Sequence, residues 1–453
     1  MSQTQLFKSK IGLVMATVGS AVGLGAVWRF PNQVQEGGGA AFLLIYVACL
    51  LILGIPVMLA EFSLGRGVRS DIIGDFRRFT PRQPWWLTGG VSLLAVYLIN
   101  GFYMVVAGWT LQYFWGSVTG SLYEGIGAES SLTFADRMQD AMTGTWSPIF
   151  WTVAVLLLNI LILLRGVQKG VEKMSNLLMP LLFILLLILC GVTLTLPGAS
   201  GGISFFLKPD FSAVTAATCV NALGQSFFSL SLGMGILLTY SAYFPDNVNL
   251  PKTSVTVAGC TLLVSVLMGL IVFPAVASFG LLSGHESMEG TALVFITLPE
   301  VFARMPGCRV WSAIFFALLA IAAVTSTLST SEVCIKFFQD RFGWSRNKSV
   351  IILLLSLCVL SPLCSLSNGP LSSFRICGMN IFDLFDNVST NYLLPIAAFL
   401  TCIYVGWKVP RGFLHDQLTD RGATLPRLAP VIVFFIRYVA PLLILTVFIY
   451  SLL

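Results

Sequence analysis

Eleven apolar runs, each about long enough to cross a lipid bilayer, constrain this chain more than any other feature of its sequence. A transmembrane helix needs roughly 20 predominantly apolar residues. Only 10% of the residues carry charge, whereas a soluble domain carries about 25%. The chain is therefore predicted to be an all-α integral membrane protein. The expected spans are 11–36, 40–64, 86–117, 148–164, 174–196, 214–243, 254–282, 309–338, 349–366, 379–407 and 429–453.

Lysine and arginine are unevenly distributed over the segments that join these spans. With the N-terminus inside, the inner segments hold eighteen of them and the outer segments six. The positive-inside rule then predicts a cytoplasmic N-terminus and, after eleven spans, an external C-terminus. The expected location is the inner (plasma) membrane of the cell, with the lipid bilayer as partner. The formal charge of +6 reflects this bias and indicates no nucleic-acid partner.

Two of the spans are rich in glycine at membrane depth. The first contains Gly19-Ser-Ala-Val-Gly-Leu-Gly25, and the sixth contains Ser229-Leu-Ser-Leu-Gly-Met-Gly235. Glycine lowers helix stability by about 1 kcal/mol relative to alanine, so both stretches unwind easily. Close helix packing through the Gly19–Gly23 spacing is the alternative for one span alone. Breaks at the same place in two successive five-span halves instead indicate a transporter site built on inverted repeats.

Unwound backbone in these spans offers defined chemistry. A half-helix that starts near Gly25 points a positive dipole end at the break, which suits a carboxylate. Carbonyls freed around Gly19 and Val22 are hard oxygen ligands that suit Na⁺. The adjacent hydroxyls of Thr325 and Ser326 in the eighth span are a weaker signal, because such groups usually bond back to their own helix.

Charged side chains inside the spans are a further signal, because they are costly there. Arg29 and Asp386 both lie toward the outer ends of their spans, so an Arg–Asp pair that closes a cavity from outside is expected. Lys336 in the eighth span is interpreted as a side chain that snorkels to the interface.

An enzyme is the first alternative class, and the sequence argues against it. Gly198-Ala-Ser-Gly-Gly202 fits a nucleophile pattern, but it follows Pro197 in an outer loop rather than a strand. The two histidines, His285 and His415, fall on opposite sides of the membrane in the expected topology. The ten cysteines lie mostly inside spans, without a CxxC, and are interpreted as packing residues.

Several motifs occur together in one order along the chain. They are Gly19-Ser-Ala-Val-Gly-Leu-Gly-Ala-Val-Trp-Arg-Phe-Pro31, Glu36-Gly-Gly-Gly-Ala, Phe102-Tyr103, Gln225-Ser-Phe-Phe-Ser-Leu-Ser-Leu-Gly-Met-Gly235, Phe295-Ile-Thr-Leu-Pro299 and Thr325-Ser326. Over essentially its whole length the chain resembles the bacterial eleven-span branch of the neurotransmitter:sodium symporters. The resemblance implies a LeuT-type fold in a single domain, 1–453. Two inverted five-helix repeats, about 11–196 and 214–407, are followed by an extra helix at about 429–453.

The resemblance also implies a substrate. Gly23 stands where amine-transporting relatives carry Asp and amino-acid transporters carry Gly, which favours an amino acid. Tyr103 is expected to bind its carboxylate, Phe228 to cover it, and Arg29 with Asp386 to form the outer gate. The implied substrate site consists of Ala21, Gly23, Leu24, Gly25, Ile99, Tyr103, Phe228, Ser229, Ser231, Met234, Ser326 and Thr330.

The ion sites of the family map unequally. The second sodium site maps onto the carbonyls of Gly19, Val22 and Ala322 and the hydroxyls of Thr325 and Ser326. At the first sodium site, the two family asparagines fall on Ala26 and Thr261. The sequence therefore predicts one tightly coupled Na⁺. Chloride is a further candidate, because the anion positions of the family read Tyr46, Gln225, Ser229 and Ser265, without a carboxylate.

The inner gate also departs from the family pattern. Its N-terminal arginine falls near Thr4, whereas the matching acid, Asp340, is present, so Lys8 or Lys10 is a candidate replacement. The expected function is sodium-coupled amino-acid import by alternating access, with no obligatory protein partner. A sodium-independent exchanger or sensor with the same fold stays open as the alternative, because the first sodium site is degraded.

Overall fold

The computed structural model describes residues 6–23, 25–126, 132–280, 290–419 and 427–451. Within these ranges the secondary structure is helical apart from two isolated β-bridges. In this described part of the chain, nine helical segments are long and apolar enough to cross a membrane. They are Ala40–Val68 (α3, α4), Trp86–Thr119 (α6), Trp146–Leu163 (α8), Val167–Leu194 (α9), Leu250–Ser278 (α13), Cys308–Phe342 (α16), Arg346–Leu366 (α17), Ile381–Lys408 (α18, α19) and Ala429–Tyr450 (α21, α22).

The other two predicted spans, the first and the sixth, are interrupted. The first consists of α1 (Lys10–Ala21), a π-helical turn (Gly25–Arg29) and α2 (Phe30–Glu36). The sixth consists of α11 (Ala216–Ser229) and the short α12 (Ile236–Ser241). With the bent first pair counted as one span, the described residues contain up to ten candidate spans, and α11 and α12 lie where the sixth span was predicted.

Short helices connect the spans. They are α5 (Ile72–Arg77), α7 (Phe134–Thr143), α10 (Ala199–Leu207), a 3₁₀ turn (Phe211–Ala213), α14 (Gly290–Ala292), a π-helical turn (Leu293–Thr297), α15 (Leu298–Ala303) and α20 (Arg411–Thr419). Two of these helices have complete or partial caps that explain where they start. Thr133 and Asp136 form a capping box for α7, and the Asp71 side chain accepts a hydrogen bond from the Ile73 amide at the start of α5.

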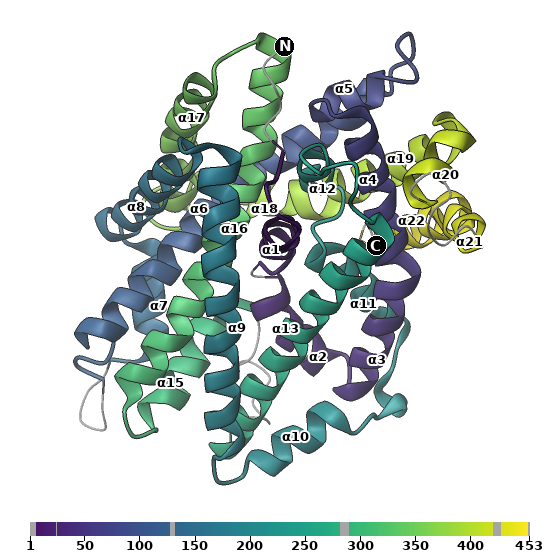
Figure 1. Ribbon diagram of the computed structural model, residues 1–453. Helices are drawn as coiled ribbons and strands as arrows, with labels where there is room; N and C mark the ends of the chain where they lie inside the picture. Colours follow the sequence, from purple (N-terminus) through teal and green to yellow (C-terminus); the bar gives the residue numbers. More distant parts are fainter. Residues whose placement is uncertain (1–5, 24, 127–131, 281–289, 420–426, 452–453) are drawn as a thin grey trace.

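Burial separates central from peripheral helices. In the most apolar stretches of α6 and α16, 61% and 67% of the residues are buried, against 22% for the last span. Figure 1 shows α1 in the middle of the bundle, between α16 and α9 on one side and α13 on the other. Large apolar side chains stay exposed on the outer helices, for example Leu161, Leu187, Leu355 and Leu442. An apolar exposed surface of this kind is what a bilayer covers.

Candidate functional site

The helix of the first span is interrupted in its glycine-rich stretch. The last regular turn of α1 closes with a hydrogen bond from the Val22 amide to the Val18 carbonyl, 2.6 Å. Helical structure resumes at Gly25, and the two halves are bent by 68°. Leu24, a predicted substrate contact, lies outside the described residues. The break therefore falls within the predicted glycine-rich stretch.

The second break is made by residues in the left-handed conformation. Ser231, Gly233 and Gly235 have φ angles of 55°, 78° and 73° between α11 and α12. Glycine adopts this conformation without a steric cost, whereas serine does so at a cost of about 1 kcal/mol or more. A strained serine in this position is typical of a functional site.

Side chains of the sixth span form hydrogen bonds with backbone carbonyls on either side of the first break. The Ser231 hydroxyl donates to the Ser20 carbonyl at the end of α1, 2.8 Å, and the Gln225 amide nitrogen donates to the Gly25 carbonyl, 2.9 Å. From α4 (Ile55–Val68), the fully buried Glu61 accepts a hydrogen bond from the Gly233 amide, 2.8 Å. Non-helical backbone at membrane depth is stable only where it is buried in protein or lines a cavity, and these contacts supply the partners.

A cavity of about 470 Å³ lies where the breaks meet. Ten of the predicted substrate residues line it, namely Ala21, Gly23, Gly25, Ile99, Tyr103, Phe228, Ser231, Met234, Ser326 and Thr330. The structure thus brings together side chains from α1, α6, α11 and α16, which lie far apart in the sequence. Ser229 does not line the cavity. Its hydroxyl instead lies 2.8 Å from the Tyr46 hydroxyl.

Four further residues line the same cavity and were not predicted as contacts: Ser20, Phe102, Ile236 and Thr390. Phe102 and Ser20 directly neighbour predicted residues, so adjacency was an available signal. Thr390 lies one helical turn after Asp386, which an i,i+4 argument identifies. Ile236 is the first residue of α12. The sequence does not show where helical structure resumes in the sixth span, so this contact was not predicted.

A second, wider cavity of about 1160 Å³ adjoins the first, and both are lined by Gly25, Phe102, Tyr103, Phe228 and Thr390. Arg29 and Asp386 line this vestibule, as expected for gate residues. They form no ion pair within 4 Å, although both lie in the described part of the chain. The Arg29 guanidinium lies 5.0 Å from the centroid of the Phe228 ring, and Asp386 accepts a hydrogen bond from Thr390, 3.0 Å. The predicted gate is open in this conformation.

The predicted sodium residues lie where α1 approaches α16. A Cβ atom added at Gly19 would lie 3.3 Å from Cβ of Thr325, so the two helices touch here. The Thr325 hydroxyl donates to the Ala322 carbonyl, 3.1 Å. The buried Ser326 hydroxyl has no hydrogen-bond partner among the described residues. At the predicted first sodium site, Ala26 offers no side-chain oxygen, and the Thr261 hydroxyl donates to its own helix at Val257, 3.0 Å.

The four predicted chloride residues are all fully buried. The Tyr46 hydroxyl lies 2.8 Å from the Ser229 hydroxyl, within hydrogen-bond distance. Gln225 lies one helical turn before Ser229, and its oxygen is unpartnered within the described ranges, as is Ser265 Oγ. The hydroxyls of Tyr46, Ser229 and Ser265 are possible donors to a small anion, whereas the Gln225 amide nitrogen already donates to the Gly25 carbonyl.

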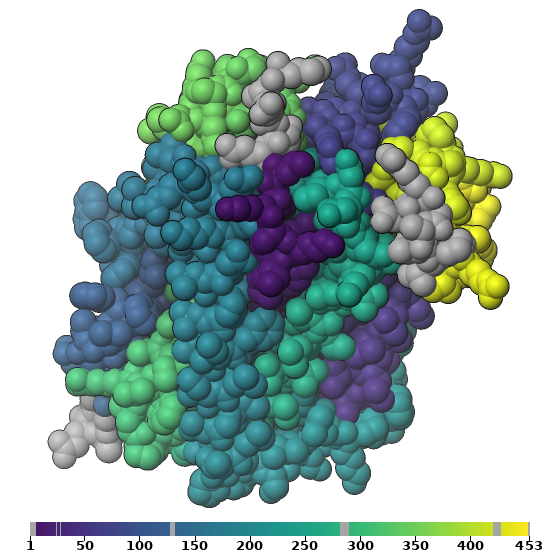
Figure 2. Space-filling view, viewed as in Figure 1, coloured from purple at the N-terminus to yellow at the C-terminus, as the bar shows by residue number. Residues whose placement is uncertain are grey.

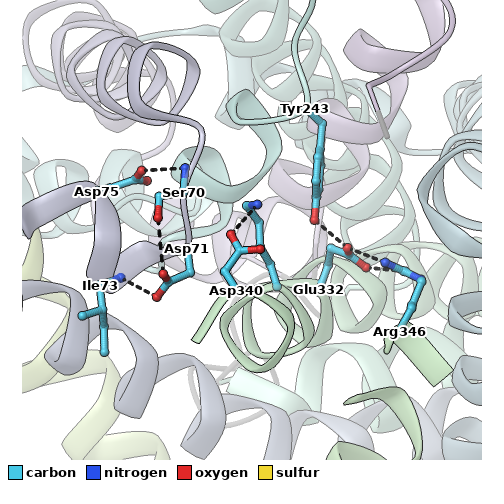
Figure 3. A network of polar contacts seen from close by, with 9 residues as sticks. Ser70, Asp71, Ile73, Asp75, Tyr243, Glu332, Asp340 and Arg346 are labelled. Atoms are coloured by element: carbon cyan, nitrogen blue, oxygen red, sulfur yellow. Dashed lines mark hydrogen bonds and ion pairs between the residues drawn. The ribbon is translucent and has the colours of Figure 1, made fainter. Parts of the chain in front are cut away.

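Figure 3 shows a polar network near the C-terminal end of α16. The side chain of Lys336 is only 4% exposed, and its ammonium group donates to Asp340, 2.9 Å. It also lies 5.3 Å from the centroid of the Tyr243 ring. The expectation that Lys336 snorkels to the interface was therefore wrong, since tertiary contacts bury it beside the predicted gate acid. Thr4, the family position of the gate arginine, lies outside the described residues.

The positive charge of Lys336 also acts on two further carboxyl groups. Asp71 and Asp75 lie in the connection between the second and third spans, and both are buried. Burial raises the pKa of each carboxyl group, and the positive charge of Lys336 opposes that rise. Lys336 is thus a counter-ion shared by Asp340 on its own helix and by the Asp71–Asp75 segment.

A separate buried ion pair ties α16 to α17. Arg346 at the start of α17 donates to both oxygens of Glu332, 2.9 and 2.7 Å, and the Tyr243 hydroxyl donates to Glu332 as well, 2.9 Å. With three donors on one carboxylate, this pair is fully satisfied (Figure 3).

Comparisons with known proteins agree with this arrangement. A family model described as the sodium:neurotransmitter symporter family matches residues 4–130 and 134–453. A Bacillus subtilis protein named uncharacterized sodium-dependent transporter YhdH is 34% identical over 97% of this chain and 96% of its own length. An uncharacterized sodium-dependent transporter of Haemophilus influenzae is 34% identical over 99% and 98%. The crystal structure of MhsT in complex with L-phenylalanine superposes with a TM-score of 0.88 at 36% identity, over 99% of both chains.

The contacts around Gly23 generate one prediction. A Cβ atom at this position would lie 2.6 Å from Ser326 Oγ and 3.1 Å from the Tyr103 hydroxyl. We expect Gly23→Ala to lower the affinity for the amino acid predicted from the sequence at least tenfold, because the methyl group fills the cavity, as measured by binding of a panel of labelled amino acids to purified protein. Gly191→Ala on α9 is the control, because a Cβ there meets nothing within 4 Å. Unchanged affinity in Gly23→Ala would place the substrate elsewhere.

The inner network generates a second prediction. Lys336→Met removes a charge-assisted hydrogen bond and the shared counter-ion, so we expect a loss of about 1.5–3 kcal/mol in stability. Denaturation of the purified protein and faster amide exchange in α5 would measure it. Lys348→Met is the control, because that lysine is exposed and contacts only the Trp344 ring, at 4.5 Å, among its described neighbours. Equal stability of the two variants would contradict a role for Lys336 as counter-ion.

Proposed function

Because the chain belongs to the sodium:neurotransmitter symporter family, we propose that it imports an amino acid with an apolar side chain together with Na⁺, by alternating access. The protein is a LeuT-fold, multi-pass secondary transporter of the sodium:neurotransmitter symporter family with a small-molecule substrate, and it is not an enzyme. The observation that carries the finer proposal is the cavity at the meeting point of the two breaks, beside Thr325 and Ser326.

The proposed carboxylate position is the start of the helical segment at Gly25. The dipole of Gly25–Glu36 favours a negative group at that end. The Gln225 amide holds the Gly25 carbonyl and so fixes the orientation of this turn. Tyr103 also lines the cavity, and its hydroxyl, which would lie 3.1 Å from a Cβ atom at Gly23, supplies a donor.

The proposed side-chain position is the rest of the cavity. Ile99, Phe102, Met234 and Ile236 give it apolar walls, and no carboxylate or cationic side chain lines it in the described part. A charged substrate side chain would lose hydration there without a partner. The L-phenylalanine in the MhsT structure makes this amino acid the first one to test.

Sodium is proposed to bind between α1 and α16. The carbonyls of Gly19, Val22 and Ala322 would join the hydroxyls of Thr325 and Ser326, and five oxygens suit a hard cation. The unpartnered Ser326 hydroxyl supports this assignment. Because Ser326 also lines the substrate cavity, one residue links ion binding to substrate binding.

The proposed stoichiometry is one coupled Na⁺. At the first family site, Ala26 has no side-chain oxygen, and the shorter side chain of Thr261 stands where the family carries an asparagine. An ion placed there would lose water without adequate replacement. The alternative function, a sodium-independent exchanger or sensor, rests on this degraded site, and sodium dependence of uptake separates the two.

Alternating access is proposed because the two ends of the path through the protein differ. The vestibule leads to the cavity past Phe228, with Arg29 and Asp386 apart from one another. At the other end, Lys336 is buried and forms an ion pair with Asp340, and Asp71 and Asp75 are buried as well. This combination supports a conformation open outward and closed inward, with Arg29 and Asp386 on one side and Asp340 on the other as proposed gate residues.

Uptake into proteoliposomes tests the proposed function. We expect labelled L-phenylalanine, or another apolar amino acid from a panel, to accumulate with an inward Na⁺ gradient and not when choline replaces Na⁺. Thr325→Ala with Ser326→Ala should abolish the sodium dependence, because two of five ligands are lost. Ser361→Ala with Ser365→Ala is the control, since it removes two buried, unpartnered serine hydroxyls on α17. Equal uptake without Na⁺ in the wild type would favour the exchanger.

Chloride dependence is tested separately. Chloride is proposed to bind among Tyr46, Gln225, Ser229 and Ser265, where it would supply a negative charge near the sodium region. Ser265→Glu should make uptake independent of chloride, because a fixed carboxylate replaces the anion, whereas Ser265→Ala should not. If wild-type uptake is the same in gluconate and in chloride, these four residues only pack together.

A further inference from the structure

A groove of about 830 Å³ lies between the start of α1 and the start of α13, away from the substrate cavity. Its walls are mainly apolar and include Ile11, Val14 and Met15 from α1. Ile11 is 69% exposed, although it belongs to a helix in the middle of the bundle. Figure 2 shows this face, with α1 in purple beside the blue-green surface of the segment that leads into α13.

Each wall of the groove carries one lysine in the first turn of its helix. Lys10 and Lys252 line the groove, and both are exposed. One helical turn farther into the protein from each lysine, the walls continue with Val14 and Thr256. Each wall is therefore cationic at the end of its helix and uncharged one turn deeper.

The nearby carboxylates do not neutralise these lysines. Glu172 accepts hydrogen bonds from the amides of Lys8 and Ser9 and from the Ser9 hydroxyl, so it caps the start of α1. Asp246 forms an ion pair with Arg69, 2.6 Å. Among the residues that the structure describes, neither Lys10 nor Lys252 takes part in an ion pair. The mouth of the groove thus has two exposed lysines that form no ion pair with any described residue.

We propose that this groove binds an anionic phospholipid of the cytoplasmic leaflet, with the headgroup phosphate between Lys10 and Lys252 and an acyl chain against Ile11, Val14 and Met15. Two charges at the mouth and apolar walls below match the order of groups in a phospholipid. Basic pockets between helices on the cytoplasmic side are known to recognise anionic headgroups. The lysine distribution of the whole chain places these two helix ends on that side.

A lipid in this groove would connect α1 to α13. The end of α1 carries Gly19 and Val22 of the proposed sodium site, and its start is held by the Glu172 cap and by the Phe7 amide, which donates to the Tyr243 carbonyl, 3.0 Å. Any movement of α1 would change the width of the groove. A bound anionic lipid therefore stabilises the conformation seen here.

Native mass spectrometry of the full-length protein in detergent tests the proposal with phosphatidylglycerol and phosphatidylcholine of equal chain length. We expect the wild type to retain phosphatidylglycerol preferentially. Lys10→Gln with Lys252→Gln should weaken phosphatidylglycerol binding about ten- to thirtyfold, the effect of two lysines near a headgroup, and leave phosphatidylcholine binding unchanged. Lys348→Gln with Lys408→Gln is the matched control, because it removes two exposed lysines outside the groove.

Three outcomes would overturn the proposal. Equal retention of both lipids by the wild type would make the groove a general apolar surface. Equal loss in the groove variant and the control variant would show an effect of net charge alone. Competition by glycerophosphate as strong as by the lipid would identify a soluble anion as the ligand. Melting temperatures of both variants without added lipid, close to that of the wild type, establish that each is folded.

Discussion

Peptide groups in the two unwound stretches cannot form hydrogen bonds with bulk water at membrane depth. Other groups of the protein must therefore supply their hydrogen-bond partners. Ser231 reaches the Ser20 carbonyl, Gln225 reaches the Gly25 carbonyl, and Glu61 accepts from the Gly233 amide. These contacts join the first, second and sixth spans at one point. The cavity forms there because the helices cannot close over backbone that is not helical. The substrate and sodium assignments both depend on these few hydrogen bonds.

The same constraint explains why glycine occurs where it does. At Gly23 a methyl group would meet Ser326 and Tyr103. At Gly233 and Gly235 the backbone has positive φ angles of 78° and 73°, which other residues adopt only with strain. Ser231 adopts such a strained conformation, with a φ angle of 55°, and its hydroxyl donates a hydrogen bond to the Ser20 carbonyl. Local backbone strain at this position is coupled to a contact between the two breaks.

Much of this arrangement could be predicted from the sequence because helix periodicity and glycine content act locally. The spans and the two breaks are of this kind, whereas the ten residues of the cavity were implied by the resemblance to the family. Contacts that depend on side-chain direction were harder to predict. Ser229 turns to Tyr46 rather than into the cavity, and Lys336 is buried beside Asp340 instead of reaching the interface. Neither a charge pattern nor a motif specifies which neighbour a side chain selects.

The account's central claim is that one Na⁺ and one amino acid bind together at the meeting point of the breaks. Equilibrium dialysis of the purified protein with labelled Na⁺ and labelled L-phenylalanine, or the apolar amino acid that binds best, measures both occupancies at once. The account predicts one sodium ion per bound amino acid, and no amino-acid binding when choline replaces Na⁺. Two sodium ions per protein, or amino-acid binding that is indifferent to Na⁺, would contradict it.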